Sequence, residues 1–182
     1  TLAISDITGM DGYLYHCVIT GSGPDLTSND ATLTVYELPL VVSQPTDIIE
    51  CPGTATSFSI TATGYNITYQ WYENQGNGWN ALFDAGVYNG VKTSNLSISD
   101  ITGMNGYTYQ CVVSGCGKTD TSNIATLNLY PPPVITSQPI DIAVCVSGGA
   151  SFSVSATGYS LTYQWYENQG SGWNLLSDGG IY

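Results

Sequence analysis

The chain has 182 residues, only 9% of them charged, and its formal net charge is −12. Lys92 and Lys118 are its only Lys or Arg residues, so the chain would repel a phosphate backbone, and nucleic acid is excluded as a partner. Glycine, serine and threonine are abundant, and much of the apolar content is tyrosine, valine and isoleucine, which favours strands and turns. We therefore expect an all-β fold.

No apolar run reaches the roughly 18 residues of a membrane span, and no N-terminal signal pattern is present. We expect no membrane insertion and no targeting signal within this sequence. The single histidine, His16, corresponds to Gln110 in the repeat described below, so a role for it in catalysis or metal binding is not expected. No motif pairs a nucleophile with a base, and we interpret the chain as a protein that is not an enzyme.

The sequence matches itself without gaps at an offset of about 94 residues, with roughly six in ten aligned positions identical. SDITGM at residues 5–10 returns at 99–104, and TYQWYENQG at residues 68–76 returns at 162–170. A unit of this length is a small domain rather than a solenoid repeat. The sequence therefore predicts similar domains joined in a row.

Two Pro-containing segments, residues 37–45 and 131–139, follow alternating apolar runs and are expected to join domains as semi-rigid linkers. One complete domain is then predicted over residues 37–130. Residues 1–36 would be the C-terminal part of a preceding domain, and residues 131–182 the N-terminal part of a following one. Neither part can close a sandwich alone, so we expect the natural molecule to be longer, unless strands of neighbouring chains complete them.

Within residues 37–130, alternating runs recur every 8 to 12 residues or so between Gly, Asn, Pro and Asp, which is typical of a β-sandwich. The predicted strands, in chain order, are residues 40–44, 47–51, 57–63, 67–73, 79–83, 94–99, 106–114 and 121–129. Asn77-Gly78 predicts a tight hairpin turn with positive φ at both positions. The predicted core comprises the alternate residues Phe58, Ile60, Ala62, Ile67, Tyr69 and Trp71.

Two segments resemble strand F of immunoglobulin domains. MDGYLYHC, which ends at Cys17, and MNGYTYQC, which ends at Cys111, are similar to the Asp-x-Gly-x-Tyr-x-Cys pattern of that strand. The resemblance implies that Tyr15 and Tyr109 lie at the tyrosine corner.

A wider pattern extends the resemblance to nearly the whole chain. Trp71 and Trp165 resemble the buried tryptophan of strand C. SQP, a cysteine before strand B, LTYQWYEN and YQCVVSG together resemble the immunoglobulin-like repeats of large Bacteroidota surface and gliding-adhesin proteins. This resemblance implies tandem immunoglobulin-like β-sandwiches at a cell surface, and it implies no particular ligand.

The five cysteines include no CxxC pair, which favours disulfides in an oxidising compartment over a metal site. In an immunoglobulin domain, Cys111 would pair with a cysteine on strand B, but Ile60 occupies that position here. Cys51 lies nine residues before Ile60. The preceding repeat keeps a cysteine, Cys17, at the Cys111 position but has Ser22 at the Cys116 position. The pairing common to both repeats is therefore predicted to be Cys51 with Cys111, and a bridge from Cys51 to Cys116 is the alternative.

The other cysteines have no predicted partner inside the chain. Cys17 and Cys145 are expected to pair with residues outside it. Cys116 corresponds to Ser22 in the preceding repeat, which makes Cys116 the candidate for an intermolecular thiol.

Trp79, Tyr72 and Tyr88 are a candidate platform for stacking on sugar rings, although aromatic residues are also ordinary strand residues. Asp84, Asp100 and Asp120 are candidates for binding Ca²⁺ at turns. Their spacing is not that of an EF-hand, and aspartate commonly bonds its own backbone in turns. We expect no cofactor, and Ca²⁺ is the one ion considered.

These patterns favour a structural or adhesive repeat region of a secreted or cell-surface fibre, either a stalk or a filament. The predicted partners are neighbouring domains of the same chain, further copies of the chain through uncharged edge strands, and surface glycans. The alternative is an array of carbohydrate-binding modules attached to a secreted hydrolase.

Overall fold

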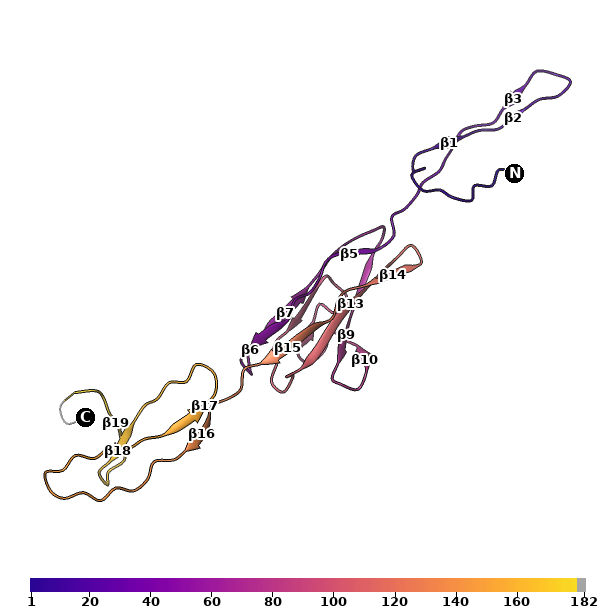
Figure 1. Ribbon diagram of the computed structural model, residues 1–182. Coiled ribbons are helices and arrows are strands. Elements are labelled where there is room, and N and C mark those ends of the chain that lie inside the picture. Colours follow the sequence, from indigo (N-terminus) through magenta and orange to yellow (C-terminus); the bar gives the residue numbers. More distant parts are fainter. Residues whose placement is uncertain (180–182) are drawn as a thin grey trace.

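The computed structural model describes residues 1–179, and its regular elements are all strands, as the all-β prediction requires (Figure 1). No helix in this range is long and apolar enough to cross a membrane. A closed sandwich spans residues 40–129, and short strand pairs lie on either side of it along the chain.

The larger sheet of the sandwich has the strand order β10-β9-β13-β15-β6, and β14 also pairs with β13. Its strands are β6 (Ile48–Glu50), β9 (Thr68–Asn74), β10 (Trp79–Ala81), β13 (Tyr107–Gly115), β14 (Lys118–Thr121) and β15 (Ala125–Leu129). β15 runs parallel to β6, and the other pairs are antiparallel. Between β14 and β15 the Ser122 hydroxyl accepts the Cys111 N–H at 2.9 Å, so the chain stays attached to β13 where the ladder is interrupted.

The opposing layer consists of two short sheets, and the chain passes directly from β7 in one sheet to β8 in the other. Its strands are β5 (Leu40–Ser43), β7 (Thr56–Ser59), β8 (Thr61–Thr63), β11 (Tyr88–Asn89) and β12 (Asn95–Ile98). β11, β12 and β7 form one sheet, and β5 pairs with β8. The Ile60 N–H donates to the Ser94 carbonyl at 3.0 Å, which bridges the gap between β7 and β8.

The core lies between the two layers, where every second residue of each strand points inward. Trp71 and Cys111 are directly opposite each other on β9 and β13, and both are fully buried. The predicted core is confirmed: Phe58 and Ile60 are buried, and Ala62, Ile67 and Tyr69 pack against the buried cluster. Because this core draws only on residues between Val41 and Leu129, we expect residues 37–130 to fold as an independent unit.

Two strands were not predicted. β11 is a two-residue strand, too short to show alternation, and β14 shares only Thr121 with the predicted strand at residues 121–129. β14 forms a hairpin with β13 in which Gly115 is opposite Lys118, so Cys116 and Gly117 make the turn. Both turn residues have positive φ, 47° and 68°, as a two-residue hairpin of type I′ requires.

The predicted turn at Asn77-Gly78 is wrong in detail. Asn74 is opposite Trp79, so the loop holds the four residues between them, and the positive φ values belong to Gly76 and Gly78. The side-chain oxygen of Asn74 accepts the N–H groups of both glycines, at 2.8 and 3.0 Å. This side-chain acceptor stabilises a longer loop, which dipeptide preference alone does not anticipate.

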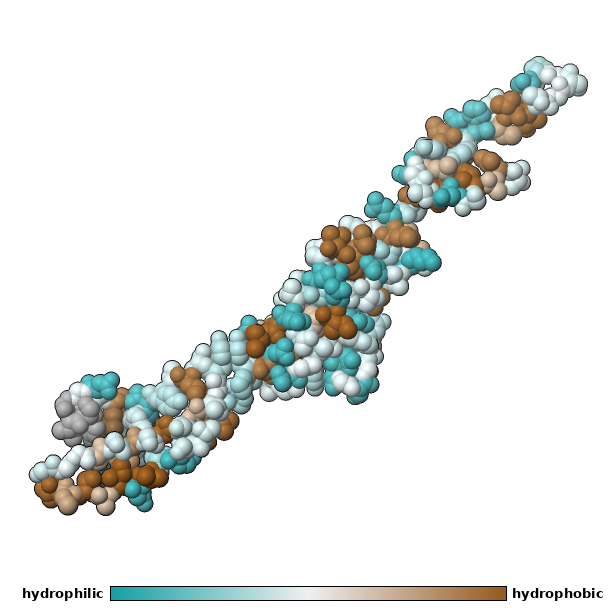
Figure 2. Space-filling model, viewed as in Figure 1, coloured by the Kyte–Doolittle hydropathy of each residue, from teal (hydrophilic) through white to brown (hydrophobic). Residues whose placement is uncertain are grey.

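β5 lies inside the first predicted linker, where a strand at residues 40–44 is also predicted, and β16 lies inside the second. The flanking strands are β1 (Leu14–Tyr15), β2 (Val18–Ile19), β3 (Leu26–Thr27), β4 (Ala31–Thr32), β16 (Val134–Ser137), β17 (Ser155–Thr157), β18 (Tyr166–Asn168) and β19 (Trp173–Leu175). They repeat the local pairings of the central sandwich. Inner-face residues here stay exposed, for example Trp165 at 40% against 0% for Trp71, and much of the apolar surface in Figure 2 lies on these segments.

Candidate functional site at the domain junctions

The same aromatic contact forms at both ends of the central sandwich. Tyr36 stacks on Tyr65 with ring centroids 3.6 Å apart and 18° between the ring planes. Tyr130 stacks on Tyr159 with centroids 3.5 Å apart and 11° between the planes. Both partners recur at the repeat offset, so the repeat specifies the junction contact as well as the domain.

A glycine holds the linker close to each stack. A Cβ on Gly64 would lie 2.9 Å from both the Leu38 carbonyl oxygen and the Pro39 Cα. At the second junction a Cβ on Gly158 would lie 2.9 Å from the Pro133 Cα. Both glycines have φ in the region that other residues rarely adopt, +134° and +146°. Only glycine lets the linker pass this close, so each junction is a packed contact rather than a loose tether.

A buried polar cluster surrounds the Glu73 carboxylate on the inner side of the larger sheet. The Tyr109 hydroxyl donates to Glu73 Oε2 at 2.9 Å, the Tyr88 hydroxyl donates to the same oxygen, and Gln75 Nε2 donates to Oε1 at 2.6 Å. Glu73 is only 4% exposed. The cluster satisfies a carboxylate that would otherwise be costly to bury.

The two tyrosines of this cluster give the domain a predicted alkaline limit. Burial is the main cause that raises the pKa of both Tyr88 and Tyr109 above the ordinary value of 10.0. A raised pKa in the folded state stabilises the fold fully below pH 10, and this contribution is lost as the pH rises above that value. We expect the unfolding free energy of residues 37–130, measured by urea titration, to fall above about pH 10, and to fall less steeply in Tyr109→Phe. If the unfolding free energy of Tyr109→Phe falls as steeply with pH as that of the unsubstituted domain, the contribution of Tyr109 to this pH dependence is contradicted.

The cysteines are not placed as predicted. Within residues 1–179 all five are free, so neither the Cys51–Cys111 bridge nor the Cys51–Cys116 alternative forms. Leu127 is opposite both Ile48 and Tyr107, and from this level Cys51 and Cys111 lie in opposite directions along the sheet. At about 3.3 Å per residue the two Cα atoms are roughly 20 Å apart, far beyond the 4.4–6.8 Å or so of a disulfide.

Cys111 and the two exposed cysteines of the unit should therefore differ in reactivity. Burial raises the pKa of the fully buried Cys111 thiol to about 12, whereas Cys51 and Cys116 are exposed. In residues 37–130 we expect an aromatic disulfide reagent to titrate two thiols rapidly and the third only in denaturant. Three thiols reacting at one rate would show that Cys111 is not held in the core.

Comparison with known proteins gives relatives for nearly the whole chain. No protein-family model matches it. Neogenin of Rattus norvegicus is 30% identical over 92% of this chain and 13% of neogenin, and Roundabout homolog 1 of Mus musculus is 28% identical over 91% and 10%. The chain thus spans a small part of these relatives. Among solved structures, extracellular domains 3–5 of Drosophila OTK have a TM-score of 0.49 at 15% identity, covering 64% of this chain and 39% of that one.

The strand order decides the fold. β5, β7 with β8, β12 and β11 take the places of strands A, B, E and D of an immunoglobulin sandwich, and β9, β13 and β14 with β15 take those of C, F and G. Trp71 is the buried tryptophan on strand C. The chain is built of immunoglobulin-like domains.

These immunoglobulin-like (Ig-like) domains differ from the expected pattern at the tyrosine corner. Tyr109 lies two residues before Cys111 as predicted, but its hydroxyl bonds the Glu73 carboxylate instead of the backbone upstream. Ile60, at the strand B position where a bridging cysteine would stand, is 3% exposed. The cystine of ordinary Ig domains is replaced here by apolar packing around Cys111.

The Ig-like sandwich divides the candidate sugar platform between its two sheets. Tyr72 and Trp79 share the outer face of β9 and β10, where Tyr72 is opposite Ala81 and Trp79 is opposite Asn74. Tyr88 belongs to β11 in the other layer, and its hydroxyl turns toward Glu73. The three aromatic residues therefore do not form one surface.

The three candidate Ca²⁺ ligands are used by the backbone. Asp84 accepts the Val91 N–H at 3.0 Å, Asp100 accepts the Thr102 N–H at 2.8 Å, and Asp120 accepts the Val41 N–H at 2.7 Å. The Asp100 bond, to the backbone two residues on, is the turn bond that aspartate commonly makes. Asp84 bonds the backbone seven residues on, and Asp120 links the β13–β14 hairpin to β5. In the part of the chain that the structure describes, no three His, Cys, Asp or Glu side chains gather closely enough to hold a metal ion.

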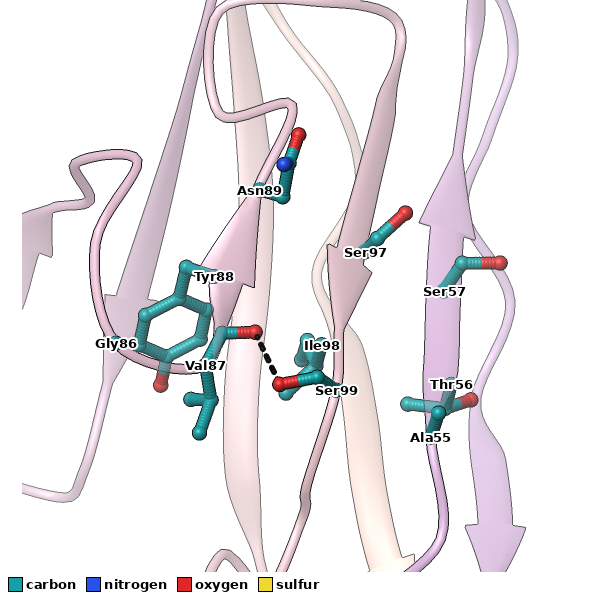
Figure 3. A pocket seen from close by; sticks show the side chains of 10 residues that line it. All are labelled: Ala55, Thr56, Ser57, Gly86, Val87, Tyr88, Asn89, Ser97, Ile98 and Ser99. Atoms are coloured by element: carbon teal, nitrogen blue, oxygen red, sulfur yellow. Dashed lines mark hydrogen bonds between the residues drawn. The ribbon is translucent and has the colours of Figure 1, made fainter.

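An open groove crosses the outer face of β11, β12 and β7 (Figure 3). Its lining residues are Ala55, Thr56, Ser57, Gly86, Val87, Tyr88, Asn89, Ser97, Ile98 and Ser99. The Ser99 hydroxyl donates to the Val87 carbonyl at 3.3 Å across it. The lining contains neither a charged side chain nor a buried polar one that would anchor a ligand.

Proposed function

We propose that the chain is a stretch of an extended stalk of Ig-like domains in a secreted or cell-surface protein, which carries an adhesive element away from the surface. One complete domain at residues 37–130 and parts of two others at 1–36 and 131–182 belong to this proposal. The observation that carries it is the tyrosine stack, which recurs on both sides of the central sandwich.

Four features restrict the angle between neighbouring domains at the first junction. The stack of Tyr36 on Tyr65 holds the residue before the linker against the following domain, and Gly64 lets the linker lie close to that domain. The Tyr65 N–H donates to the Glu37 carbonyl at 3.2 Å, which ties the linker to the same loop. Proline in the linker removes further backbone freedom. Domains joined in this way give length and direction, which a stalk requires.

The relatives support an extracellular setting, since neogenin, Roundabout and hemicentin are cell-surface or extracellular proteins. The net charge of −12 favours solubility of a long array. A source among Bacteroidota gliding adhesins has no support in the comparisons. The carbohydrate-binding alternative is not favoured, because the aromatic platform is divided between two sheets.

The test uses arrays of two and four copies of residues 37–130, in which Tyr130 of one copy precedes Glu37 of the next. A nine-residue strand and a short linker add roughly 40 Å per copy if domains lie in line. We expect the maximum dimension from small-angle X-ray scattering to grow by about this amount per copy. Monomeric arrays in sedimentation velocity would show that length comes from the chain itself rather than from lateral assembly.

A junction variant and a matched control complete the test. Tyr130→Ser at every junction is expected to shorten the array, because the ring stack is lost while the linker stays intact. Phe83→Ser removes an exposed aromatic side chain away from the junctions and should leave the dimension unchanged. Compact four-copy arrays, or equal dimensions for all three proteins, would contradict the stalk.

A further inference from the structure

Cys116 lies beside the stack at the front of its own domain. It forms the tip of the β13–β14 hairpin, next to Gly115. A Cβ on Gly115 would lie 2.9 Å from the Tyr65 carbonyl oxygen, so the hairpin tip packs on the loop that carries the stacked ring. Cys116 also contributes to raising the pKa of Tyr36, behind the larger effect of the hydrogen bond with Tyr65.

Cys51 lies beside the stack at the rear of the same domain. It directly follows Glu50, whose carbonyl accepts the Tyr130 N–H at 2.9 Å. Tyr130 is the residue that stacks on Tyr159 of the following segment. Cys51 contributes to raising the pKa of Tyr130, behind the larger effect of the hydrogen bond with Tyr159. Cys51 is thus the rear counterpart of Cys116.

The repeat superimposes these two positions on one junction. Tyr36 and Tyr130 are equivalent, so every stack has a Cys51 position on its preceding side and a Cys116 position on its following side. We propose that Cys51 of one Ig-like domain forms a disulfide with the Cys116 counterpart of the next domain, across the stacked junction. This inference rests on the proposed tandem arrangement. It gives a partner to two exposed cysteines that are free within their own domain.

The reaction needs an oxidant, and a small-molecule disulfide such as oxidised glutathione supplies it. One protein thiolate attacks the small disulfide and releases one small thiol, and the second protein thiolate then displaces the other. The new S–S bond takes the place of the one that breaks, and both electrons and protons end on the two small thiols. Ser22 stands at the Cys116 position of the preceding repeat, so the array would contain both bridged and unbridged junctions.

The test uses two copies of residues 37–130 in tandem. In the inner-pair protein, Cys116→Ser in the first copy and Cys51→Ser in the second leave the two thiols that flank the shared junction. In the outer-pair control, Cys51→Ser in the first copy and Cys116→Ser in the second leave the same two residue types at the far ends. Cys111 stays in both copies of both proteins.

After equilibration in a glutathione redox buffer, we expect the inner-pair protein to lose two thiols per chain while remaining monomeric. Mass-spectrometric peptide mapping should then identify the peptide that joins Cys51 to Cys116. The outer-pair control and a single copy of residues 37–130 should keep all their thiols, or show only mixed disulfides with glutathione. An inner-pair protein that behaves like its control would overturn the bridge. If that protein is still elongated in scattering, the stalk survives and only the bridge fails.

Discussion

Replacing Glu73 by alanine in residues 37–130 is expected to lower the free energy of unfolding by about 3 kcal/mol, measured by urea denaturation. The variant leaves the Tyr109 hydroxyl, inside the core, without its carboxylate acceptor at 2.9 Å. The Tyr88 hydroxyl loses the same acceptor. Hydrogen bonds to a charged group contribute about 1.5–3 kcal/mol each, and part of this is recovered because no carboxylate then has to be buried.

Glu50→Ala is the matched control, since Glu50 is an exposed glutamate at the end of β6. It should change the free energy of unfolding by less than about 0.5 kcal/mol. Glu73→Gln should fall between the two variants, because an amide oxygen still accepts a hydrogen bond. Equal stabilities for the Glu73→Ala and Glu50→Ala proteins would mean that the buried cluster does not stabilise the domain.

Gly90→Ala is expected to lower the free energy of unfolding by roughly 3 kcal/mol or more. This is the largest effect expected from adding one methyl group to the domain. Gly90 has φ +76°, and a Cβ there would lie 2.3 Å from the Asn95 carbonyl oxygen. That oxygen is backbone at the start of β12, so relief requires moving the strand. The loss adds a backbone clash to the cost of a left-handed conformation, which is about 1–2 kcal/mol for a residue with a Cβ.

Gly103→Ala separates these two costs. Gly103 has nearly the same φ, +80°, but no atom lies within 4 Å of the position that a Cβ would take. Gly103→Ala should therefore lower the free energy of unfolding only by the conformational cost, about 1 kcal/mol. Thermal or urea unfolding that gives both alanine variants the same stability would show that the turn at Gly90 relaxes freely.

Much of the sandwich follows from alternation and from the repeat. Phe58, Ile60 and Trp71 were predicted to share the core because inward positions recur with period two. β11 and β14 escaped prediction for a physical reason: a two-residue strand cannot show a period, and the β14 hairpin depends on Cys116 adopting a positive φ. Propensity gives no indication of that conformation for cysteine.

The candidate sites were less predictable, because they depend on which elements meet in space. Tyr88 was grouped with Trp79 because the two are close in sequence, yet they belong to opposite layers. Glu73 was missed, although it has the same strand parity as Trp71 and recurs as Glu167, which is a signal for a buried carboxylate. The Cys51–Cys111 pairing is predicted from the cysteines common to the two repeats, and the register of β6 along β15 separates these residues.

The central claim is that the repeat specifies a rigid junction as well as a domain, and a crystal or cryo-electron microscopy structure of two tandem copies of residues 37–130 tests it most directly. We predict that Tyr130 of the first copy stacks on Tyr65 of the second, with the linker against Gly64 and the two sandwiches in one fixed orientation. Two domains found in several orientations, with these tyrosines apart, would contradict the account.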